Sequence, residues 1–516
     1  MLRQTETTVP VLIVGAGPTG LNLALSLARR GVPFRFIDQK EGSGEHSRAM
    51  VVQARTLEFY RQYGFADEVV EAGVKVEAAH VREGRENGES HELVSFRFTD
   101  FGEHLTPFAF PLAYPQDDHE RLLVRKLEEA GGRVEWKTKL NSFTQDEHGV
   151  EAKIVGPDSV GATVSASYIC GCDGGHSVVR EQLGIGFSGG TYPQLYYVAD
   201  VKLEQGFERD FVVYLGSKRF DLLTPVRSRG VQRLIGVVPE DLNGREDLTF
   251  EDIRSRVEPF INVTISEVNW FSTYKVHHRV ADHFQQGRSF ILGDAGHVHS
   301  PTGGQGMNTG IGDAINLGWK LAQVVQGRAD QSLLDSYETE RIKFARSLVR
   351  TTDEAFNVII AAGPLGSLGR RYLIPGVIAL ASRFKAGQRA FFKAVSQTEI
   401  EYEDSAISDG SRGELRGGDR LPWIDDGTDN FAPLSSLDWQ AHVYGTADHS
   451  LQTTCSNLQL PLHTFAWTAA AEKADFKKDV ALLIRPDGYI ALVLPQTDST
   501  NRLLSFCDEF KLKFRT

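Results

Sequence analysis

The feature of the sequence that most constrains the fold is a glycine-rich turn close to the N-terminus. Gly15, Gly17 and Gly20 form a G-x-G-x-x-G pattern between the apolar run VLIV and a segment with apolar residues at helical spacing. The first glycine permits a tight turn, the second lets backbone approach a pyrophosphate, and the helix N-terminus favours its negative charge. Asp38, at the end of the next apolar run, is positioned to accept a hydrogen bond from a ribose hydroxyl. The pattern predicts a βαβ unit that binds a dinucleotide and begins a doubly wound parallel sheet.

A second glycine-rich segment, at residues 293–308, has the features of another phosphate-like cradle. It begins with Gly293 and Asp294 after the apolar run SFIL and leads into a predicted helix over residues 310–325. Backbone N–H groups at the start of that helix would stabilise negative charge, and an acid at a strand end suits a polyol hydroxyl. The candidate contacts are Asp294, Gly304, Gly306, Met307 and Asn308. Because one nucleotide needs only one cradle, two cradles favour a dinucleotide that carries a redox ring.

Composition and charge exclude several classes of partner. The 516 residues carry a formal net charge of −12, whereas nucleic acid and anionic membranes both favour basic surfaces. Hydrophobic residues make up 41% and charged residues 24% of the chain, which is typical of a globular enzyme of two or three domains. The apolar stretch 372–381 is shorter than the ~20 residues of a transmembrane helix, and the N-terminal run ends at glycine like a strand.

Cysteine usage predicts a reducing compartment and no metal site. Cys170, Cys172, Cys455 and Cys507 are the only cysteines, and they contain no C-x-x-C pair. Cys170 and Cys172 alternate along an apolar strand, so we interpret them as buried small hydrophobic residues. We therefore expect a cytoplasmic protein.

The order of the predicted elements divides the chain into interleaved domains of an α/β fold. The runs FVVYLG, FDLLTPV and LIGVVP predict a mostly antiparallel sheet with little helical periodicity, and the Gly-, Asp- and Pro-rich stretch 410–432 predicts a linker. The predicted domains are a Rossmann-like nucleotide-binding domain of residues 1–73, 112–186 and 281–360, a substrate-binding sheet of residues 74–111 and 187–280, a helical connection of residues 361–404 and a C-terminal domain of residues 405–516.

A third motif lies between the two glycine-rich segments, at Cys172-Asp173-Gly174 through Arg180. With three motifs in this order, the chain resembles the class A flavoprotein monooxygenases, the aromatic hydroxylase family that includes para-hydroxybenzoate hydroxylase and phenol hydroxylase. The resemblance covers roughly residues 10–360 and implies tightly, non-covalently bound FAD. It also implies NADPH or NADH as a transient co-substrate, because the family and this chain both lack a second nicotinamide-binding βαβ unit.

The resemblance implies roles for particular residues. Asp294 is similar to the acid that binds the ribityl chain, and residues 301–308 are similar to the segment beside the isoalloxazine ring. Asp173 is similar to a residue that serves the FAD pyrophosphate and the reductant, and the alternative is a cap at a strand end. Further positions similar to FAD contacts are Gln39, Arg48 and Gln116. Arg48 and Gln116 also fit simple surface residues.

The chemistry implied by the resemblance is hydroxylation of a phenolic or polyketide-like aromatic molecule by NAD(P)H and O2, through a hydroperoxide at flavin C4a. The alternatives are Baeyer–Villiger or epoxidation chemistry, a flavin reductase or halogenase, and a non-catalytic flavoprotein; the G-W-x-W-x-I-P run of halogenases is missing. Pro301 and Tyr214 are the candidate catalytic residues, although a packed tyrosine is the better interpretation of Tyr214. His297 and His299 invite acid–base roles, but this chemistry chiefly needs a dry pocket, so we assign both structural roles.

The stretch Arg485 to Ile490 resembles the thioredoxin-like C-terminal domain of larger family members. Its redox cysteines are absent, since Cys455 and Cys507 lie far apart in the sequence. We interpret this C-terminal domain as a structural or dimer-supporting domain. The protein itself is expected to be a monomer or a homodimer. The expected partners are an aromatic substrate, O2 and NAD(P)H, without nucleic acid or membrane.

Overall fold

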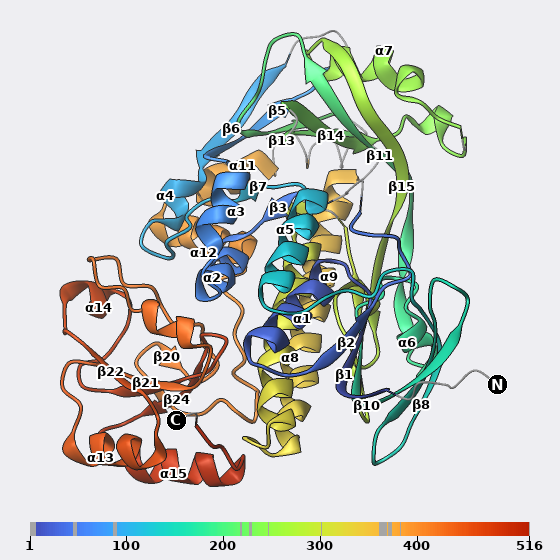
Figure 1. The fold of residues 1–516 in the computed structure, drawn as a ribbon. Helices are drawn as coiled ribbons and strands as arrows, with labels where there is room; N and C mark the ends of the chain where they lie inside the picture. Colours follow the sequence, from blue (N-terminus) through green and yellow to red (C-terminus); the bar gives the residue numbers. More distant parts are fainter. Residues whose placement is uncertain are drawn as a thin grey trace.

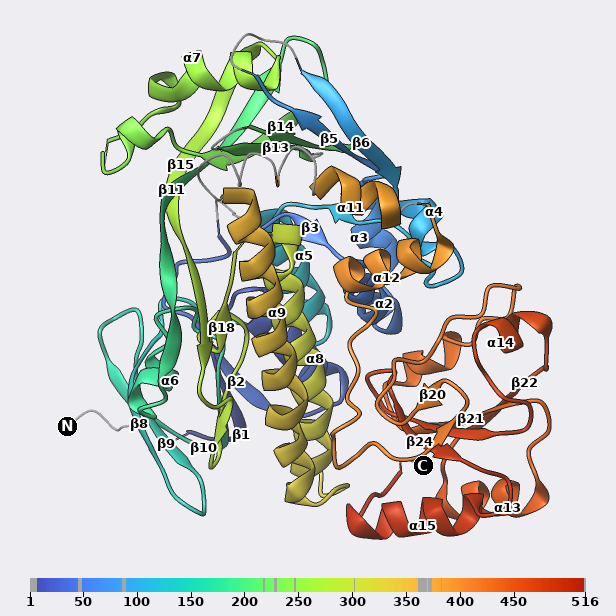
Figure 2. The same ribbon diagram turned by 180° about the vertical axis from the view of Figure 1, so that it is seen from behind.

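The structure is a computed structural model. It describes residues 7–44, 49–85, 90–216, 219–226, 230–245, 247–300, 302–360, 369, 374–381 and 383–514. In this part of the chain a parallel sheet, a large antiparallel sheet and a C-terminal module are connected by two long helices, α8 (Gly306–Val325) and α9 (Ser336–Ile360), as Figure 1 shows. Seen from behind, α8 and α9 run side by side through the centre of the molecule (Figure 2). The predicted α/β class is confirmed.

The parallel sheet brings three strand ends next to one another. β1 (Thr7–Val14) pairs in parallel with β2 (Phe34–Ile37) on one side and with β10 (Gly161–Gly171) on the other, and β10 pairs in parallel with β17 (Ser289–Ile291). Residues 11–13 are fully buried, as expected for a strand covered on both faces. The antiparallel additions to this sheet are β8 (Lys139–Gln145), β9 (Val150–Val155) and β16 (Gln285–Gln286).

Helices cover this sheet where the sequence predicts them. α1 (Pro18–Arg29) begins with a proline in its first turn, where a missing N–H costs no hydrogen bond. α5 (Gln116–Glu129) packs beside α1, and α6 (Val178–Gln182) follows β10. The adjoining 3-10 helices are η3 (Gly293–Ala295), η4 (Thr302–Gly304) and η5 (Gln331–Asp335).

The antiparallel sheet lies over the parallel-sheet domain and extends down beside it. Its strand order is β18-β15-β11-β14-β13-β12-β5-β6. β11 (Phe187–Leu203) and β15 (Ile265–Ala281) run from the top of the molecule to the level of the parallel sheet (Figure 1). The other strands are β5 (Ala78–Glu83), β6 (His91–Arg97), β12 (Phe211–Leu215), β13 (Phe220–Val226), β14 (Val231–Val237) and β18 (His297–Val298).

One helix in this region departs from the expectation of little helical periodicity. α7 (Phe250–Ile261) packs Ile253, Val257 and Phe260 against the outer face of the antiparallel sheet. Its apolar residues recur at helical spacing, and Thr249 with Asp252 forms a capping box at its start. The helical signal was therefore present, but it is confined to twelve residues between long β runs.

A small three-stranded sheet and several helices fill the space between the two large sheets. The strand order of the small sheet is β3-β7-β4. Its strands are β3 (Val51–Val52), β4 (Val74–Lys75) and β7 (Leu112–Ala113). The helices are α2 (Ala54–Gln62), α3 (Ala66–Ala72), α4 (Phe98–Gly102), α11 (Ile374–Ala381) and α12 (Lys385–Ser396).

The C-terminal module has a four-stranded sheet in the order β22-β21-β23-β24. β21 and β22 are parallel, whereas β23 and β24 are antiparallel to their neighbours. A parallel pair joined by a helix and followed by an antiparallel hairpin is the arrangement of a thioredoxin-like domain. The elements are β21 (Gln440–Tyr444), α13 (His449–Leu458), β22 (Leu462–Phe465), α14 (Ala469–Lys473), β23 (Ala481–Ile484), β24 (Ile490–Leu494) and α15 (Ser499–Glu509).

The first part of the stretch predicted as a linker is instead packed onto this module. β19 (Ser411–Arg412) and β20 (Leu415–Arg416) form a hairpin beside β24. A Cβ on Gly410 would lie 2.4 Å from the carbonyl oxygen of Val493, and one on Gly417 would lie 2.8 Å from that of Ala491. The glycines in this segment therefore permit close backbone approach, which composition alone does not distinguish from flexibility.

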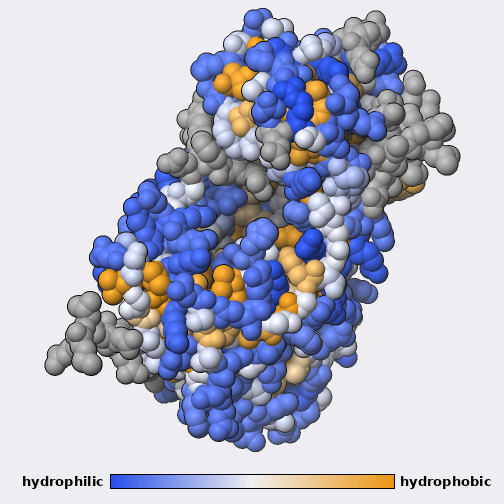
Figure 3. All heavy atoms as spheres, turned by 90° about the vertical axis from the view of Figure 1, so that its right-hand side faces the viewer, coloured by the Kyte–Doolittle hydropathy of each residue, from blue (hydrophilic) through white to orange (hydrophobic). Residues whose placement is uncertain are grey.

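The hydrophilic character of the surface and the burial of the cysteines are those expected from the composition of a globular enzyme. On the face drawn in Figure 3 most of the surface is hydrophilic, with apolar residues gathered in patches across its middle and near its upper end. No helix among the described residues is both long and apolar enough to cross a bilayer. All four cysteines are buried and unpaired, and the burial of Cys170 and Cys172 was predicted.

Candidate active site

The three sequence motifs meet at the carboxyl ends of β1, β10 and β17. Gly15, after β1, has a φ of +100°, and a Cβ there would lie 2.3 Å from the carbonyl oxygen of Cys172, after β10. A Cβ on Gly293, after β17, would lie 2.5 Å from the hydroxyl of Thr19 in α1. Ligands of open parallel sheets bind outside the carboxyl ends of the strands, so this edge is the candidate active site.

The backbone around Gly17 fits the pyrophosphate of a dinucleotide. Among the described residues, no atom beyond the chain neighbours of Gly17 would lie within 4 Å of a Cβ placed on it, although the glycines on either side of it in the motif are tightly packed. Gly17 is the N-cap of α1, whose first turn directs backbone N–H groups out of the helix. Open space combined with those donors is what an approaching diphosphate requires.

Asp38 lies beside this turn and helps to hold it. Its carboxylate accepts hydrogen bonds from the backbone N–H groups of Ala16, at 2.5 Å, and of Lys40, at 2.7 Å. The Asp38 side chain therefore fixes the loop after β1 against the end of β2. Gln39, next to it, is exposed.

Small residues bring α1 and α8 into close contact. A Cβ on Gly310 would lie 2.3 Å from the Thr19 hydroxyl, and a Cβ on Gly318 would lie 2.4 Å from the Ser26 hydroxyl. Because both positions are glycines, the two helices approach closely enough to place the start of α8 beside the start of α1. The two predicted cradles are therefore neighbours in space.

A buried cluster of charged residues holds the loop after β17. The Asp313 carboxylate, on α8, accepts hydrogen bonds from the Gly293 backbone N–H at 3.0 Å and from Arg341 Nε at 2.6 Å. Its Oδ2 also lies 2.7 Å from Nε2 of His297. Burial alone would raise the pKa of Asp313, but the charges of Arg341 and His297 more than offset it, and the pKa is lowered. Asp313 is therefore an anion that ties α8 and α9 to the loop.

The start of α8 is tied to β3 through Asn308. Its Oδ1 accepts from the Gln53 backbone N–H at 2.9 Å and from the Thr56 hydroxyl at 2.8 Å, while its Nδ2 donates to the carbonyls of Val51 and Gly304, each at 2.8 Å. The side chain is thus satisfied by protein groups, and its contribution to a ligand site is to position the backbone. Gly304 permits this contact, since a Cβ there would lie 2.9 Å from Val51.

The D-G motif caps a helix and connects two loops. Asp173 accepts hydrogen bonds from the Ser177 hydroxyl, at 2.5 Å, and the Val179 backbone N–H, at 3.2 Å, as in the strand-end cap alternative. Burial raises the pKa of its carboxyl group. Arg180 donates to the carbonyls of Gly175, at 3.0 Å, and Ala295, at 2.9 Å. This arginine therefore joins the loop after β10 to the loop after β17.

The two histidines of the loop after β17 have different surroundings. His297 is buried against Asp313, in agreement with the structural role assigned to it. His299 Nδ1 lies 2.7 Å from the Ser300 carbonyl oxygen, and burial lowers the pKa of the imidazole to about 4. Its Nε2 is buried and has no hydrogen-bond partner among the described residues. A Cβ on Gly306 would lie 3.5 Å from this nitrogen, which places His299 beside the start of α8.

The remaining predicted residues are placed as follows. Arg48 and Pro301 lie outside the described residues. Asp294 is exposed within η3, and Met307 is partly buried against the main core. Gln116 donates to Glu120 at 2.8 Å, at the start of α5. These residues stay predictions for cofactor contacts.

Tyr214 lies on the face of the antiparallel sheet that packs against α7. It is 2% exposed and belongs to the cluster with Val257 and Phe260 of that helix. Because side chains alternate along a strand, its neighbours Val213 and Leu215 are on the opposite face, in a separate cluster with Ile378 of α11. The structure therefore places Tyr214 in packing, away from the other predicted site residues.

Sequence reasoning missed Asp313, Arg341, Arg180 and Thr19. For Asp313 a signal existed, because an acid inside the apolar helical run GIGDAINLGW needs a buried partner. No comparable signal identifies Arg341, which is on another helix and has ordinary neighbours in the sequence.

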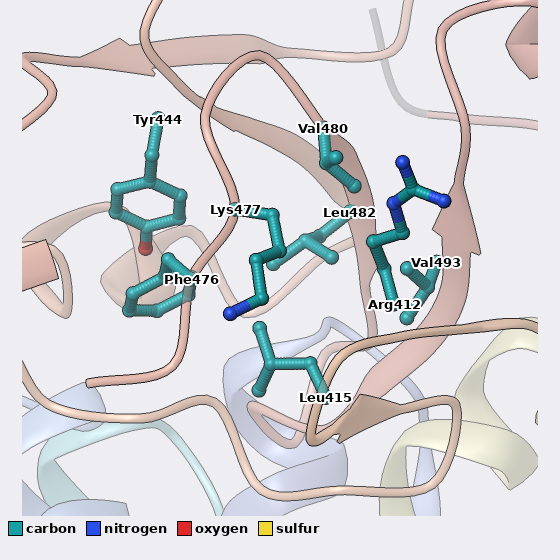
Figure 4. Close-up of a pocket in the computed structure, with 8 residues that line it drawn as sticks. All are labelled: Arg412, Leu415, Tyr444, Phe476, Lys477, Val480, Leu482 and Val493. Atoms are coloured by element: carbon teal, nitrogen blue, oxygen red, sulfur yellow. The ribbon is translucent and has the colours of Figure 1, made fainter. Parts of the chain in front are cut away.

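The C-terminal module contains a small pocket that does not compete with this site. It is lined by Arg412, Leu415, Tyr444, Phe476, Lys477, Val480, Leu482 and Val493 (Figure 4). Ligand pockets are usually of ~300–1,000 Å³, whereas the interior of this one has no room for a water molecule, so it cannot hold a dinucleotide. None of the three motifs contributes to it.

Comparison with known proteins identifies the family. The model of the FAD-binding domain family matches residues 8–352, which contain all three motifs. The chain is 31% identical over 514 residues to a flavin-dependent monooxygenase of Mycobacteroides abscessus, a match that covers 96% of this chain and 98% of the relative. The chain therefore belongs to the FAD-binding family of flavoprotein monooxygenases.

Two further similarities extend this result. Pentachlorophenol 4-monooxygenase of Sphingobium chlorophenolicum is 34% identical over 363 residues, with 68% of this chain and 65% of the relative covered. The solved structure of an anhydrotetracycline hydroxylase of Streptomyces rimosus superposes with a TM-score of 0.77 at 25% identity, covering 98% of this chain and 99% of that one. FAD as cofactor and monooxygenation as reaction class are thereby shown, as the three motifs predict.

Proposed function

We propose that this enzyme hydroxylates an aromatic small molecule of phenolic or polyketide type with O2, using NADPH or NADH as reductant. The observation that carries the proposal is the convergence of three motifs at one sheet edge, where Gly15 contacts Cys172 and Gly293 contacts Thr19, in a chain of this family. The relatives named for pentachlorophenol and anhydrotetracycline support an aromatic substrate.

The geometry and the family resemblance together support a set of residues that would hold FAD. The open backbone at Gly17 and the first turn of α1 would accept the pyrophosphate, with Asp38 at the ribose and Asp294 at the ribityl chain. The start of α8, held by Asn308, would lie beside the isoalloxazine ring. When bound, FAD supplies the hydride acceptance and oxygen chemistry that amino-acid side chains lack.

The protein would contribute positioning and exclusion of water. The inner face of the antiparallel sheet carries a cluster that includes Tyr192, Tyr196, Phe220 and Tyr274. Aromatic faces and edges of this kind pack favourably against a ring substrate. His299 is neutral above its pKa of about 4, so it would add a hydrogen-bond acceptor beside α8 without adding charge.

Oxygen-18 labelling tests the proposal. Protein purified with FAD is incubated with NADPH or NADH under 18O2 and a panel of phenols and polycyclic phenolic ketones. The expected result is substrate-stimulated NAD(P)H oxidation and a product that is 16 or 18 mass units heavier according to the oxygen isotope, as one inserted oxygen atom requires. Consumption of NAD(P)H with hydrogen peroxide but no labelled product from any ring compound would overturn it. A ring-expanded ester would redirect it to Baeyer–Villiger chemistry.

A further inference from the structure

We propose that the C-terminal module positions the FAD-binding loop after β17, and that Arg341 and Tyr402 are the positioning residues through which it acts. The inference extends from family membership and concerns FAD binding, so it does not depend on the substrate proposed above. It gives a function to a module that lacks redox cysteines.

A continuous path of hydrogen bonds connects the module to the loop. Gly418 N–H donates to the Ile490 carbonyl of β24 at 2.7 Å, and Tyr402 N–H donates to the Gly418 carbonyl at 2.9 Å. Arg341 Nη1 then donates to the Tyr402 hydroxyl at 2.9 Å, and Arg341 Nε donates to Asp313 at 2.6 Å. Asp313 in turn accepts from the Gly293 N–H at 3.0 Å. Each step joins buried or backbone groups, so the path is protected from solvent.

The same helix that carries Arg341 also anchors the module. Glu340, the preceding residue of α9, accepts two hydrogen bonds from Arg485, at 2.8 and 2.9 Å. Arg485 also donates to Asp487, and both Arg485 and Glu340 side chains are 0% exposed. Lys320 Nζ completes the cluster at 2.8 Å from Glu340. A bidentate, fully buried ion pair of this kind fixes geometry, because any displacement leaves charges unpaired.

Aromatic packing links the anchor to the path. The rings of Tyr402 and Tyr489 have centroids 4.4 Å apart, and the Arg485 guanidinium lies 5.2 Å from the Tyr402 ring and 5.4 Å from the Tyr489 ring. The Tyr402 hydroxyl is therefore held in place for Arg341 by the module. Two neighbouring residues of α9 thus have different contacts: Glu340 binds Arg485 of the module, and Arg341 binds Asp313, which holds the loop.

Matched substitutions separate this role from simple stabilisation. Tyr402→Phe removes the hydroxyl that Arg341 contacts and keeps the ring. Tyr489→Phe removes a hydroxyl from the same buried cluster, and no hydrogen bond of that hydroxyl is found among the described residues. The first readout is hydrogen–deuterium exchange of the FAD-free protein over residues 289–299. The second is the Kd for FAD, from fluorescence titration, together with the absorption spectrum of the bound flavin.

The expected result is faster exchange over residues 289–299 in Tyr402→Phe and a Kd for FAD about threefold to tenfold higher, because a hydrogen bond to a charged group is lost. Tyr489→Phe should match the wild type in both readouts. Arg341→Lys, which keeps the charge but not the two-pronged geometry, should resemble Tyr402→Phe in the FAD titration. Equal exchange and equal Kd in the two tyrosine variants would overturn the proposal, even if both lower the unfolding temperature.

Discussion

The loop after β1 and the loop after β17 lie side by side at the candidate FAD site, but they are held by different means. The first is determined by glycine: Gly15 and Gly20 permit backbone contacts that any side chain would block, and Asp38 alone adds a charged group. The second is held by side chains, since Asp313 and Arg180 fix its backbone from α8 and α6. The first loop is therefore held by its own backbone conformation and by close backbone contacts, including that with Cys172, whereas the second is held by charged side chains of other helices.

The largest expected effect tests the glycine-determined loop. Gly15→Ala places a Cβ 2.3 Å from the Cys172 carbonyl oxygen at a φ of +100°, so we expect a loss of at least about 4 kcal/mol in the free energy of unfolding. Gly31→Ala is the matched control, because its φ is also positive, at +70°, but no described residue other than its chain neighbours would come within 4 Å of the new Cβ. A loss of about 1 kcal/mol in the free energy of unfolding is expected. Chemical denaturation of the FAD-free proteins measures both, and similar losses would show that close approach is not the cause.

The second prediction tests the loop held by side chains. Asp313→Asn removes the buried anion between Arg341 and His297, which leaves the arginine without its charged partner, and should cost about 3 kcal/mol in the free energy of unfolding. Asp294→Asn, in the same loop but exposed, should change that free energy by less than about 0.5 kcal/mol. If the Asp294 variant also binds FAD as tightly as the wild type, the proposed ribityl contact is wrong.

The third prediction separates ligand binding from folding within the first loop. Gly17→Ala adds a methyl group that no other described residue approaches within 4 Å, apart from its chain neighbours, so the unfolding of the FAD-free protein should be unchanged within about 0.5 kcal/mol. The same methyl group would occupy the space proposed for the pyrophosphate. The Kd for FAD should therefore rise by about tenfold or more, equivalent to about 1.4 kcal/mol. Fluorescence titration measures it, and an unchanged Kd contradicts the placement of the pyrophosphate.

The last prediction tests the loop held by side chains through the pH dependence of its stability. The pKa of His299 is lowered to about 4 in the folded protein, from an ordinary value of 6.5, so the unfolded chain binds more protons between these values. Its contribution makes the folded state less stable as pH falls from about 6.5 to about 4, by about 2 to 3 kcal/mol, since each pKa unit corresponds to about 1.4 kcal/mol. His299→Asn, whose amide can still donate to the Ser300 carbonyl, should lose that share of the pH dependence. Denaturation of both FAD-free proteins at pH 7 and pH 4.5 measures the difference, and parallel losses exclude His299 as its source.

The contrast between the loops also explains what could be predicted from the sequence. Gly15, Gly17 and Gly20 report a local backbone requirement, so the strand, turn and helix around them follow from a short stretch of sequence. The β-like runs FVVYLG, FDLLTPV and LIGVVP likewise predicted the antiparallel sheet. The side chain of Tyr214 could be assigned to a sheet but not to one of its faces, because that depends on where α7 packs.

The partners of Asp313 illustrate the limit. Arg341 is on another helix, and nothing in the residues around it distinguishes an arginine that pairs with a buried acid from one on the surface. The glycines at 410–418 illustrate a second limit, since composition predicts a linker while the contacts with β24 require close packing. In each case the missing information is which distant segment packs against the residue.

The buried fork of Arg485, shared between Asp487 of its own module and Glu340 of α9, also has a consequence for protein engineering. A C-terminal module transplanted from a related enzyme would have to bring an arginine and an aspartate in this register, or else bury Glu340 and Lys320 without their third partner. Chimaeras between such enzymes should therefore be screened first at these few positions. Compatibility at this buried charge cluster decides whether the transplanted module and the rest of the chain form a single folded protein.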